Sequence, residues 1–372
     1  MRIAINCRSI LLSQRTGIGR YTYHLLDNLG KIDHANEYIL HVPKRLFDFK
    51  RRLPDFSRYN NFKNRIDCFH RGIGKSDIYH LPCPDVIGPY SGKLIVTIHD
   101  LIYKTYPQSH NPQTIELTEK YMQAITAKAD KIICISENTR RDLHSFCDYP
   151  LEKSCVVYNG ADQHLFYPLS SQERLNAASQ LKAIGIDKPY VLYVGTIEPR
   201  KNLTGLLESF ALLKSKKVFH GQLVVAGMKG WMQESLGELI KKSGIGRDVI
   251  FTGYISDGQL CQLYNMAEVF VFPSFYEGFG FPILEAFCCG AAVITSQTSS
   301  CAEIASDAAL TVDPKDTTAI AQAMAHVLSD KVLKGSLSKA GLKRAQNFSF
   351  LDTARQTRMV YEDQEHTKKI YI

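Results

Sequence analysis

Two glutamates separated by a glycine-rich segment are the residues of this chain best placed to do chemistry. Glu277 and Glu285 lie in the run PSFYEGFGFPILEA, residues 273–286. The glycines between them permit tight backbone turns, and Pro282 suits the first turn of a helix, where its missing N–H is not needed. We therefore expect Glu277 on a loop and Glu285 about one turn inside a helix.

Such a segment can bind a ligand that carries both hydroxyls and negative charge. A carboxylate accepts hydrogen bonds from two hydroxyls, and amides at a helix start attract anions. Backbone amides near Gly278, Phe279 and Gly280 would supply the anion donors. The alternatives are a solvated loop acid for Glu277 and, for Glu285, a charge that stabilises a helix N-terminus.

A second candidate site follows an apolar run at residues 190–194. Gly195 ends this run, and Arg200 and Lys201 come directly afterwards. Basic side chains beyond a strand-end glycine can reach a diphosphate whose oxygens gain charge during a reaction. The alternative is an exposed basic turn.

Histidine and glycine candidates occur in the first half of the chain. His99 follows the apolar strand predicted at residues 94–98, and Gly17 and Gly19 lie near the N-terminus. The glycine pair is weak evidence for a dinucleotide fingerprint, because Thr22 occupies the place of the third glycine. His99 could instead be a strand-end histidine satisfied by backbone, and the glycines a surface turn.

Two successive series of apolar strands and helix patterns organise the chain. Together they predict an α/β protein with two doubly wound parallel sheets. We expect a first domain at residues 1–168, a second at 169–347 and a last helical segment at 348–372. The strands are expected at residues 2–6, 38–42, 77–81, 94–98, 131–135 and 155–158, then at 190–194, 223–226, 249–251, 269–272, 292–295 and 309–312.

Composition narrows the class of protein. The 372 residues contain 45% hydrophobic and 22% charged residues, as in an ordinary globular enzyme, and no apolar stretch reaches the ~18 residues that span a membrane. We therefore expect a cytoplasmic protein. The ten cysteines lie mostly in apolar settings without a C-x-x-C pair, which predicts reduced core thiols and no structural metal site.

The net charge of +8 is concentrated in the first half of the chain. Lysines and arginines alternate with aromatic residues between Lys44 and Arg71, a stretch that suits contact with an anionic membrane surface. The alternative is a solvated, irregular surface loop. Nucleic-acid binding is not expected, because no motif for it accompanies these charges.

The segment from Glu277 to Glu285 resembles the E-x7-E signature of retaining glycosyltransferase family four. Members of that family have the GT-B fold, two facing Rossmann-like domains with a C-terminal helix that crosses back to the first. Further resemblances to the family lie, in matching order, at residues 16–21, 97–100, 135–143, 158–162 and 194–202.

The resemblance implies a role for each candidate residue in binding a nucleotide-sugar donor. Glu285 would bind the ribose hydroxyls, and Glu277 the hydroxyls of the transferred sugar. Arg200 and Lys201, with the Gly195 turn, would hold the diphosphate. A flexible loop at Gly17 and Gly19 would place amides near the diphosphate or the acceptor, amides at Gly278, Phe279 and Gly280 would hold the sugar, and His99 would position it.

From these roles we expect a retaining hexosyltransferase. Likeness to bacterial mannosyltransferases of surface polysaccharide and lipopolysaccharide synthesis favours GDP-mannose as donor and a saccharide or lipid-linked saccharide as acceptor. No cofactor or metal is expected, since the chain lacks a D-x-D triplet. Peripheral contact with the inner face of the cell membrane is expected if the acceptor is lipid-linked.

Several alternatives to this function stay open. The donor could be UDP-glucose or UDP-N-acetylhexosamine. The chain could be a GT-B sugar-nucleotide epimerase, which transfers no sugar to an acceptor, or a nicotinamide-dependent oxidoreductase, which Thr22 disfavours. A non-catalytic sugar-nucleotide sensor or scaffold is the non-enzyme alternative.

Overall fold

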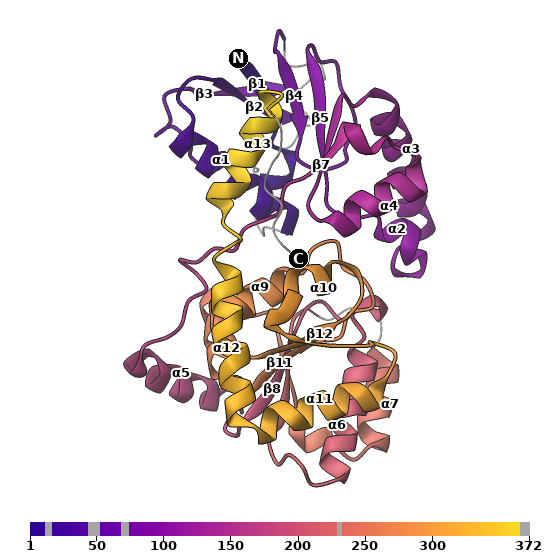
Figure 1. Cartoon of the computed structure of the whole chain (residues 1–372), viewed down its shortest axis with the longest axis vertical. Coiled ribbons are helices and arrows are strands. Elements are labelled where there is room, and N and C mark those ends of the chain that lie inside the picture. The colour runs from indigo at the N-terminus through magenta and orange to yellow at the C-terminus, as the bar shows by residue number, and fades with distance from the viewer. Residues whose placement is uncertain (12–16, 44–52, 68–73, 229–232, 365–372) are drawn as a thin grey trace. The chain divides into compact units, whose positions relative to one another are not determined.

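The structure is a computed structural model that describes residues 1–11, 17–43, 53–67, 74–228 and 233–364 (Figure 1). The chain divides into two compact units. The first contains residues 1–160 and the segment that begins at Phe348, and the second is Ala161–Asn347.

The first unit contains, within the described residues, a seven-stranded parallel sheet of order β3-β2-β1-β4-β5-β6-β7. Its direction of growth reverses between β1 and β4, and loops at the carboxyl ends of strands beside such a switch point are where ligands bind in doubly wound folds. The strands are β1 (Arg2–Asn6), β2 (Glu37–Pro43), β3 (Phe62–Asp67), β4 (Ile78–Leu81), β5 (Lys93–Ile98), β6 (Lys131–Cys134) and β7 (Ser154–Val156).

Helices cover this sheet, and the C-terminal helix is one of them. The side-chain oxygens of Asn111 and Ser136 cap α3 and α4, because each accepts a hydrogen bond from a helix-start amide. The helices are α1 (Gly17–Ile32), α2 (Ile102–Thr105), α3 (Pro112–Lys128), α4 (Glu137–Cys147) and α13 (Phe350–Tyr361), with short 3-10 turns η1 (Arg8–Ile10), η2 (Pro107–Ser109) and η3 (Leu151–Lys153).

The second unit contains a six-stranded parallel sheet within the described residues, of order β10-β9-β8-β11-β12-β13. Its switch point lies between β8 and β11. The predicted pair of doubly wound parallel sheets is therefore confirmed. The strands are β8 (Tyr190–Val194), β9 (Gln222–Ala226), β10 (Val249–Gly253), β11 (Val269–Phe272), β12 (Val293–Ser296) and β13 (Leu310–Val312).

Capped helices connect these strands. Ser170 and Ser256 each form a reciprocal capping box, with Glu173 and Gln259 respectively. The helices are α5 (Ser171–Ala183), α6 (Leu203–Ser215), α7 (Gln233–Lys242), α8 (Asp257–Met266), α9 (Phe281–Cys288), α10 (Ser299–Ala305), α11 (Thr317–Ser329) and α12 (Lys331–Ala345), with 3-10 turns η4 (Pro199–Lys201), η5 (Gly246–Asp248) and η6 (Ser306–Ala308).

The boundary between the two units lies between Gly160 and Ala161, earlier in the sequence than the expected boundary at residue 168. Phe166 packs edge-on against Tyr264 of α8, with ring centroids 6.1 Å apart. Asn265 donates a hydrogen bond of 2.9 Å to the carbonyl oxygen of Tyr167 and accepts one of 2.8 Å from the amide of Leu169. These contacts place residues 161–168 in the second unit.

The strand β3 was not among the expected strands. It lies in the basic and aromatic stretch, at the edge of the first sheet, where Lys63 and Arg65 are exposed. The aromatic side chains of the described part pack inward, since Phe56 is 3% exposed and Tyr59 and Phe62 pack against the apolar core. The alternative of a solvated, irregular loop is therefore wrong for Phe62–Asp67, and the aromatic side chains of residues 53–61 are packed against the core although their backbone is irregular. Lys44, Arg45, Lys50, Arg51, Arg52 and Arg71 lie outside the described residues.

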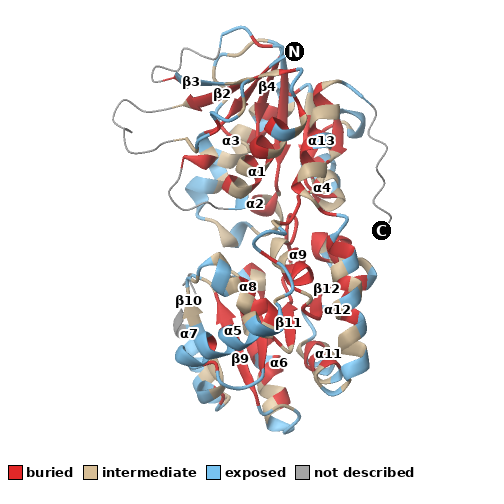
Figure 2. Ribbon diagram, turned by 90° about the vertical axis from the view of Figure 1, so that its left-hand side faces the viewer, coloured by how far each residue is buried: buried red, intermediate tan, exposed pale blue. Residues whose placement is uncertain are grey.

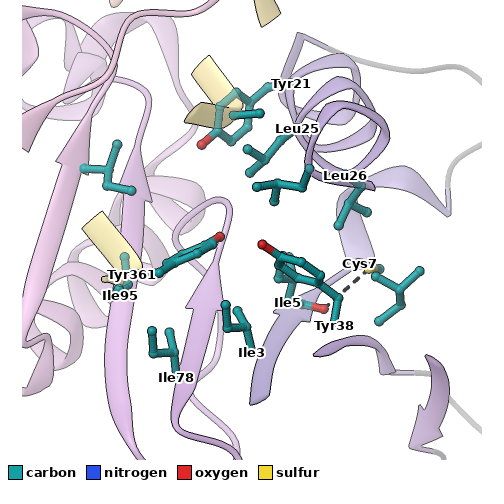
Figure 3. Close-up of a cluster of buried hydrophobic side chains, with 14 of the residues drawn as sticks. Ile3, Ile5, Cys7, Tyr21, Leu25, Leu26, Tyr38, Ile78, Ile95 and Tyr361 are labelled. Carbon is teal, nitrogen blue, oxygen red and sulfur yellow. Dashed lines mark hydrogen bonds between the residues drawn. The ribbon is translucent and has the colours of Figure 1, made fainter. Parts of the chain in front are cut away.

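Apolar strand residues form the core of each unit (Figure 2). In the first unit, Ile3, Ile5 and Ile78 of the sheet lie in one cluster with Leu25 of α1 and Tyr361 of α13 (Figure 3). This cluster explains why the C-terminal helix belongs to the first unit. Central strands such as β5, β8 and β11 are apolar and buried on both faces, as expected for parallel strands covered by helices.

A buried polar network runs through the first core. His80 of β4 is hydrogen-bonded to the Tyr361 hydroxyl at 2.6 Å and to the Thr97 hydroxyl at 2.9 Å. Thr97 also pairs with the hydroxyl of Tyr21 on α1 at 3.0 Å. Burial lowers the pKa of His80 to about 3, so its ring is neutral at neutral pH. The network ties both α1 and α13 to the centre of the sheet.

In the described part of the chain, no helix is long and apolar enough to cross a membrane.

The entry into α13 should tolerate no side chain at residue 160. A Cβ atom on Gly160 would lie 2.0 Å from the amide nitrogen of Phe350. We expect Gly160→Ala to lower the free energy of unfolding by about 2 kcal/mol, because overpacked backbone must shift. Urea unfolding measures this change. The control is Gly237→Ala in α7, where a Cβ meets nothing within 4 Å and alanine should be neutral or stabilising; equal stability of both variants would contradict the expectation.

Candidate active site

The candidate residues of the second unit lie at the carboxyl ends of β8 and β11, the two strands beside its switch point. Arg200 and Lys201 belong to η4, which follows β8, and Glu277 belongs to the loop between β11 and α9. The two loops are joined by backbone, because the Phe275 amide donates to the Arg200 carbonyl oxygen at 2.9 Å. Residues from the loops that follow two different strands therefore lie together in one site.

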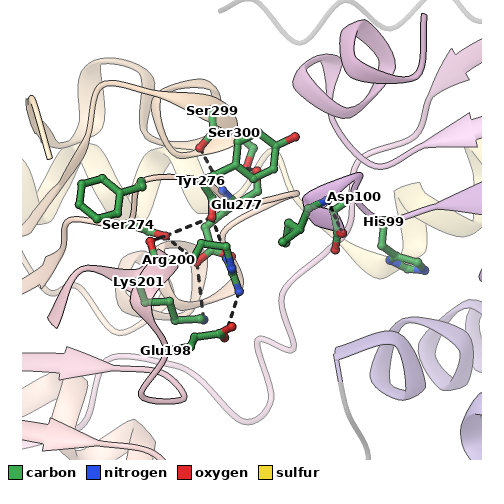
Figure 4. Close-up of polar contacts among 12 residues, drawn as sticks. His99, Asp100, Glu198, Arg200, Lys201, Ser274, Tyr276, Glu277, Ser299 and Ser300 are labelled. Atoms are coloured by element: carbon green, nitrogen blue, oxygen red, sulfur yellow. Dashed lines mark hydrogen bonds and ion pairs between the residues drawn. The ribbon is translucent and has the colours of Figure 1, made fainter. Parts of the chain in front are cut away.

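Glu277 is a buried carboxylate held between two cations (Figure 4). Its Oε2 lies 2.7 Å from Nη1 of Arg200, and its Oε1 lies 3.6 Å from Nζ of Lys201. The Ser274 hydroxyl donates to the same Oε1 at 2.9 Å. The structure therefore brings together three residues that the sequence analysis placed at two separate sites, and the solvated loop acid is wrong for Glu277.

The ionisation of Glu277 is decided by its neighbours. Burial raises its pKa, but the charges of Lys201 and Arg200 and hydrogen bonds from Arg200 and Ser274 outweigh burial, so the pKa lies below the ordinary 4.5. The carboxylate is thus charged at neutral pH. It offsets part of the positive charge that Arg200 and Lys201 concentrate here.

Arg200 is buried rather than exposed in a turn. Its Nη1 also donates to the Tyr276 carbonyl oxygen at 2.7 Å, and its Nη2 pairs with Glu198 at 3.1 Å. Lys201 extends past Gly195, where a Cβ atom would lie 3.0 Å from its Cδ, and its Nζ lies 5.3 Å from the centre of the Phe272 ring. An exposed basic turn is therefore wrong for these two residues, and glycine at 195 makes room for the lysine.

Sequence reasoning missed the polar residues that fix Glu277. Ser299 accepts a hydrogen bond of 3.1 Å from the Glu277 amide, and the Ser300 hydroxyl donates to the Glu277 carbonyl oxygen at 2.8 Å. Both serines follow β12, the next strand of the sheet. The signal was their place directly after a predicted strand, which resembles that of Arg200 and Glu277.

Glu285 lies on α9, as expected, and is half-buried. The Tyr264 hydroxyl of α8 donates to its Oε2 at 3.1 Å. A carboxylate can accept several hydrogen bonds, so the contact with Tyr264 does not by itself occupy all the acceptor positions of Glu285. Tyr264 was not foreseen, because its helix is separate from α9 in the sequence.

Gly280 begins α9 in a conformation that few other residues adopt. Its φ is +112°, and a Cβ atom would lie 3.2 Å from Cδ1 of Ile283. Gly278 and Phe279 are buried beside it, and the Phe279 ring packs on Phe281. The expected glycine turn and helix start are present, with Pro282 in the first turn of the helix.

His99 follows β5 in the first unit and is 7% exposed. Its Nε2 lies 2.8 Å from the carbonyl oxygen of Pro82, which can only accept, so Nε2 carries the proton. Burial lowers the pKa of His99 to about 4, although the Pro82 hydrogen bond opposes this. A neutral ring of this tautomer has an acceptor at Nδ1, which suits positioning of a hydroxyl better than donation of a proton.

Gly17 and Gly19 lie in the first turns of α1, so the expected flexible loop is wrong for them. The N–H groups in the first turn of a helix point toward its N-terminal end. Asp100 accepts a hydrogen bond of 3.0 Å from the Ile102 amide, so it orders the loop after His99.

Among the described residues, no group of three or more His, Cys, Asp or Glu side chains is arranged to hold a metal ion.

Comparison with known proteins identifies both halves of the chain. Residues 15–165 match the family model described as Glycosyltransferase Family 4, and residues 177–344 match the model described as Glycosyl transferases group 1. The chain is 30% identical over 370 residues to O-antigen chain mannosyltransferase B of Escherichia coli, an alignment that covers 93% of this chain and 96% of that protein. It is 28% identical to the E. coli serotype-specific mannosyltransferase WbdA over 78% of this chain and 36% of that longer protein.

Solved structures show the same architecture. Sucrose-phosphate synthase from Thermosynechococcus elongatus superposes with a TM-score of 0.72 at 21% identity, covering 97% of this chain and 98% of that one. WaaG, a glycosyltransferase involved in lipopolysaccharide biosynthesis, superposes with a TM-score of 0.68 at 15% identity, covering 96% and 99%.

Two Rossmann-like units with parallel sheets, and the likeness to these solved structures, define the GT-B fold class. The family models and the 30% identical relative define the chain as a glycosyltransferase. The chain belongs to glycosyltransferase family 4.

Replacing Glu277 with a neutral residue tests how much its charge contributes to the free energy of unfolding. We expect Glu277→Gln to lower the free energy of unfolding by about 3 kcal/mol at neutral pH, since it leaves buried cations without their carboxylate. The stabilisation from the ionised carboxylate is fully present above pH 4.5 and is lost as pH falls through the lowered folded-state pKa. The difference between the variant and the parent in urea unfolding should therefore shrink below pH 4.5. The exposed Glu238→Gln serves as control, and a difference that does not change with pH would show that Glu277 is not the titrating group.

Proposed function

We propose that this glycosyltransferase is a retaining mannosyltransferase that moves mannose from GDP-mannose to a saccharide or lipid-linked saccharide acceptor. The observation that carries the proposal is the Arg200–Glu277–Lys201 cluster at the switch point of the second sheet. Mannose as the transferred sugar is supported by the 30% identity, across 93% of the chain, to an O-antigen chain mannosyltransferase.

In this proposal Arg200 and Lys201 bind the diphosphate of the donor. Negative charge grows on the leaving diphosphate as the glycosidic bond breaks, and fixed cations stabilise that charge without rearranging. Arg200 is held by Glu277, Glu198 and the Tyr276 carbonyl oxygen, so it is oriented before a ligand arrives. The two cations take the part that a divalent ion plays in other transferases, and no metal is required.

Glu285 binds the ribose hydroxyls of the nucleotide. Its carboxylate is anchored on one oxygen by Tyr264 at 3.1 Å, which fixes its direction and leaves acceptor capacity for hydroxyls. Glu277, with amides at Gly278, Phe279 and Gly280, takes hydroxyls of the transferred sugar. Neither carboxylate needs to act as a nucleophile.

Retention of configuration follows from attack on the same face as the departing diphosphate. The acceptor hydroxyl bonds to the anomeric carbon while the bond to the diphosphate oxygen breaks, and the β-phosphate takes the acceptor proton. His99 contributes a neutral acceptor for a sugar hydroxyl, and the α1 start at Gly17 and Gly19 contributes amides. The positive charge that develops on the sugar is stabilised by the diphosphate itself.

A lipid-linked acceptor would bring the first unit to an anionic membrane. Lys63 and Arg65 on the edge strand β3 are exposed, and they are basic residues of the described part that could make this contact. Contact with the inner face of the cell membrane stays a prediction, and sedimentation with anionic liposomes at low salt tests it.

The proposed reaction is tested with purified protein, a panel of nucleotide sugars and mannose-terminated, lipid-linked oligosaccharides. We expect GDP-mannose to raise the unfolding temperature, and product with retained anomeric configuration to form only when acceptor is present, with and without EDTA. If UDP-glucose or UDP-N-acetylhexosamine raises the unfolding temperature and GDP-mannose does not, GDP-mannose is not the donor and the stabilising nucleotide sugar takes its place in the proposal. A C2 epimer formed without acceptor would indicate an epimerase, donor binding without turnover a sensor, and loss of activity in EDTA a metal-dependent mechanism.

The ribose role of Glu285 predicts a defect in binding. Glu285→Ala should weaken donor affinity at least about tenfold, in keeping with loss of hydrogen bonds to a charged group. The fold should be retained, because the side chain is half-buried at the edge of the core. Calorimetric titration with GDP and GDP-mannose measures the effect, with the exposed Glu238→Ala as control. Unchanged affinity in Glu285→Ala would remove this residue from the ribose site.

A further inference from the structure

Two buried cysteines of the second unit lie with their sulfur atoms in contact. Cys261 is on α8, and Cys289 caps the C-terminus of α9. Their Sγ atoms are 3.9 Å apart. A disulfide requires about 2.05 Å, so a modest shift of the two packed helices would bring the sulfurs within bonding distance.

The two thiols differ in character. The Cys289 S–H donates toward Cys261, and this hydrogen bond is the largest of the causes that lower the pKa of Cys261 to about 7. The Asn265 side chain adds a second donor 3.6 Å from the Cys261 sulfur. Burial raises the pKa of Cys289. The Cys261 thiol also donates toward the carbonyl oxygen of Tyr167 at 3.7 Å. Of the two sulfurs, Cys261 is the one that loses its proton more readily, with Cys289 as the thiol in contact with it, which is the arrangement of an attacking and a resolving cysteine.

Cys261 borders a cavity. The cysteine is 3% exposed, yet it forms part of the wall of a cavity of about 270 Å³. Tyr167, Leu169, Glu173 and Gly258 line the same cavity. This volume admits a hydroperoxide, which is little larger than water.

We propose that Cys261 and Cys289 form a modification site at which a hydroperoxide converts two thiols into a disulfide between α8 and α9. The Cys261 thiolate attacks one peroxide oxygen, the O–O bond breaks, and the sulfur becomes a sulfenic acid while hydroxide or alkoxide leaves and takes a proton. The Cys289 thiol then attacks this sulfur, the S–S bond forms, and water leaves. The net change oxidises two thiols and reduces one peroxide, and a dithiol reductant reverses it.

The disulfide would act on the carboxylate proposed to bind ribose. Tyr264, one turn after Cys261 on α8, donates to Glu285 at 3.1 Å, and the Cys289 amide donates to the Glu285 carbonyl oxygen at 3.1 Å. Drawing the two sulfurs together shifts α8 against α9 and so disturbs the Tyr264–Glu285 hydrogen bond. This second part, lower donor affinity in the oxidised form, rests on the proposed function.

Peptide mapping tests the disulfide without any activity measurement. The reduced full chain is treated with hydrogen peroxide, its free thiols are counted, and peptides are analysed by mass spectrometry without reduction. We expect a linked peptide pair that joins Cys261 to Cys289, reversed by dithiothreitol. The link should persist in Cys288→Ala and in the control Cys147→Ser, a half-buried thiol on α4, and should disappear in Cys261→Ala.

The mapping has clear outcomes that would overturn the proposal. These are a link from Cys261 to Cys288, a sulfinic acid at Cys261 without a link, or thiols that stay unreacted. All of these are measured on the parent chain, so they do not depend on a variant that folds.

Donor affinity is measured separately on the mapped, oxidised protein. We expect the affinity for GDP-mannose to fall about tenfold on oxidation, as loss of a hydrogen bond to a charged group implies, and to recover on reduction. In Cys261→Ala the affinity should not respond to peroxide. A fully linked protein with unchanged affinity would refute the coupling but not the disulfide. If the reduced protein binds no GDP-mannose, the proposed donor is wrong, and the mapping result still stands.

Discussion

The buried carboxylate of Glu277 is the constraint on which the site of the second unit depends. A charge taken out of water must be paired and hydrogen-bonded, and Glu277 meets this requirement only while Arg200, Lys201 and Ser274 surround it. These partners come from the loops after β8 and β11, so both loops must keep one geometry. A buried ion pair adds little net stability compared with apolar packing, whereas loss of one member is costly. The cluster does give a fixed arrangement of charge, which the proposed reaction, with its departing diphosphate, would require.

The first unit also buries polar side chains near the switch point of its sheet, but these groups are neutral. At its switch point, His80, Thr97 and Tyr21 form a hydrogen-bonded network, and His99 follows the strand that carries Thr97. Burial keeps both histidines uncharged at neutral pH, with pKa values of about 3 for His80 and about 4 for His99. Because a neutral network needs no counter-ion, it can lie deep in the core, and there it also holds the C-terminal helix through Tyr361.

The fold and the family could be predicted from the sequence because their signals are local. The bounds of β1, β8 and β11 match the expected residues, since each is a short apolar run that a polar residue, glycine or proline ends. The strand β3 escaped prediction because its residues KNRI are exposed at a sheet edge and show no apolar pattern. The helix start at Gly17 escaped it because glycine is a poor helix former. The pairing of Glu277 with Arg200 could not be read at all, because it requires β8 and β11 to be neighbours although β9 and β10 lie between them in the chain.

The same argument explains why the supporting residues were harder to find than the candidate residues themselves. Glu277, Arg200 and Lys201 are charged residues in loops that follow apolar strands, and Glu285 is on the helix after Glu277, so a local motif marked them as candidates. Ser274, Ser299, Ser300 and Tyr264 are ordinary residue types, and only their contacts with the two glutamates distinguish them. The charged residues set which ligand can bind, but the serines and the tyrosine set the direction in which each carboxylate faces. Under the proposed function, specificity among nucleotide sugars should therefore depend on these neutral partners as much as on the charged residues.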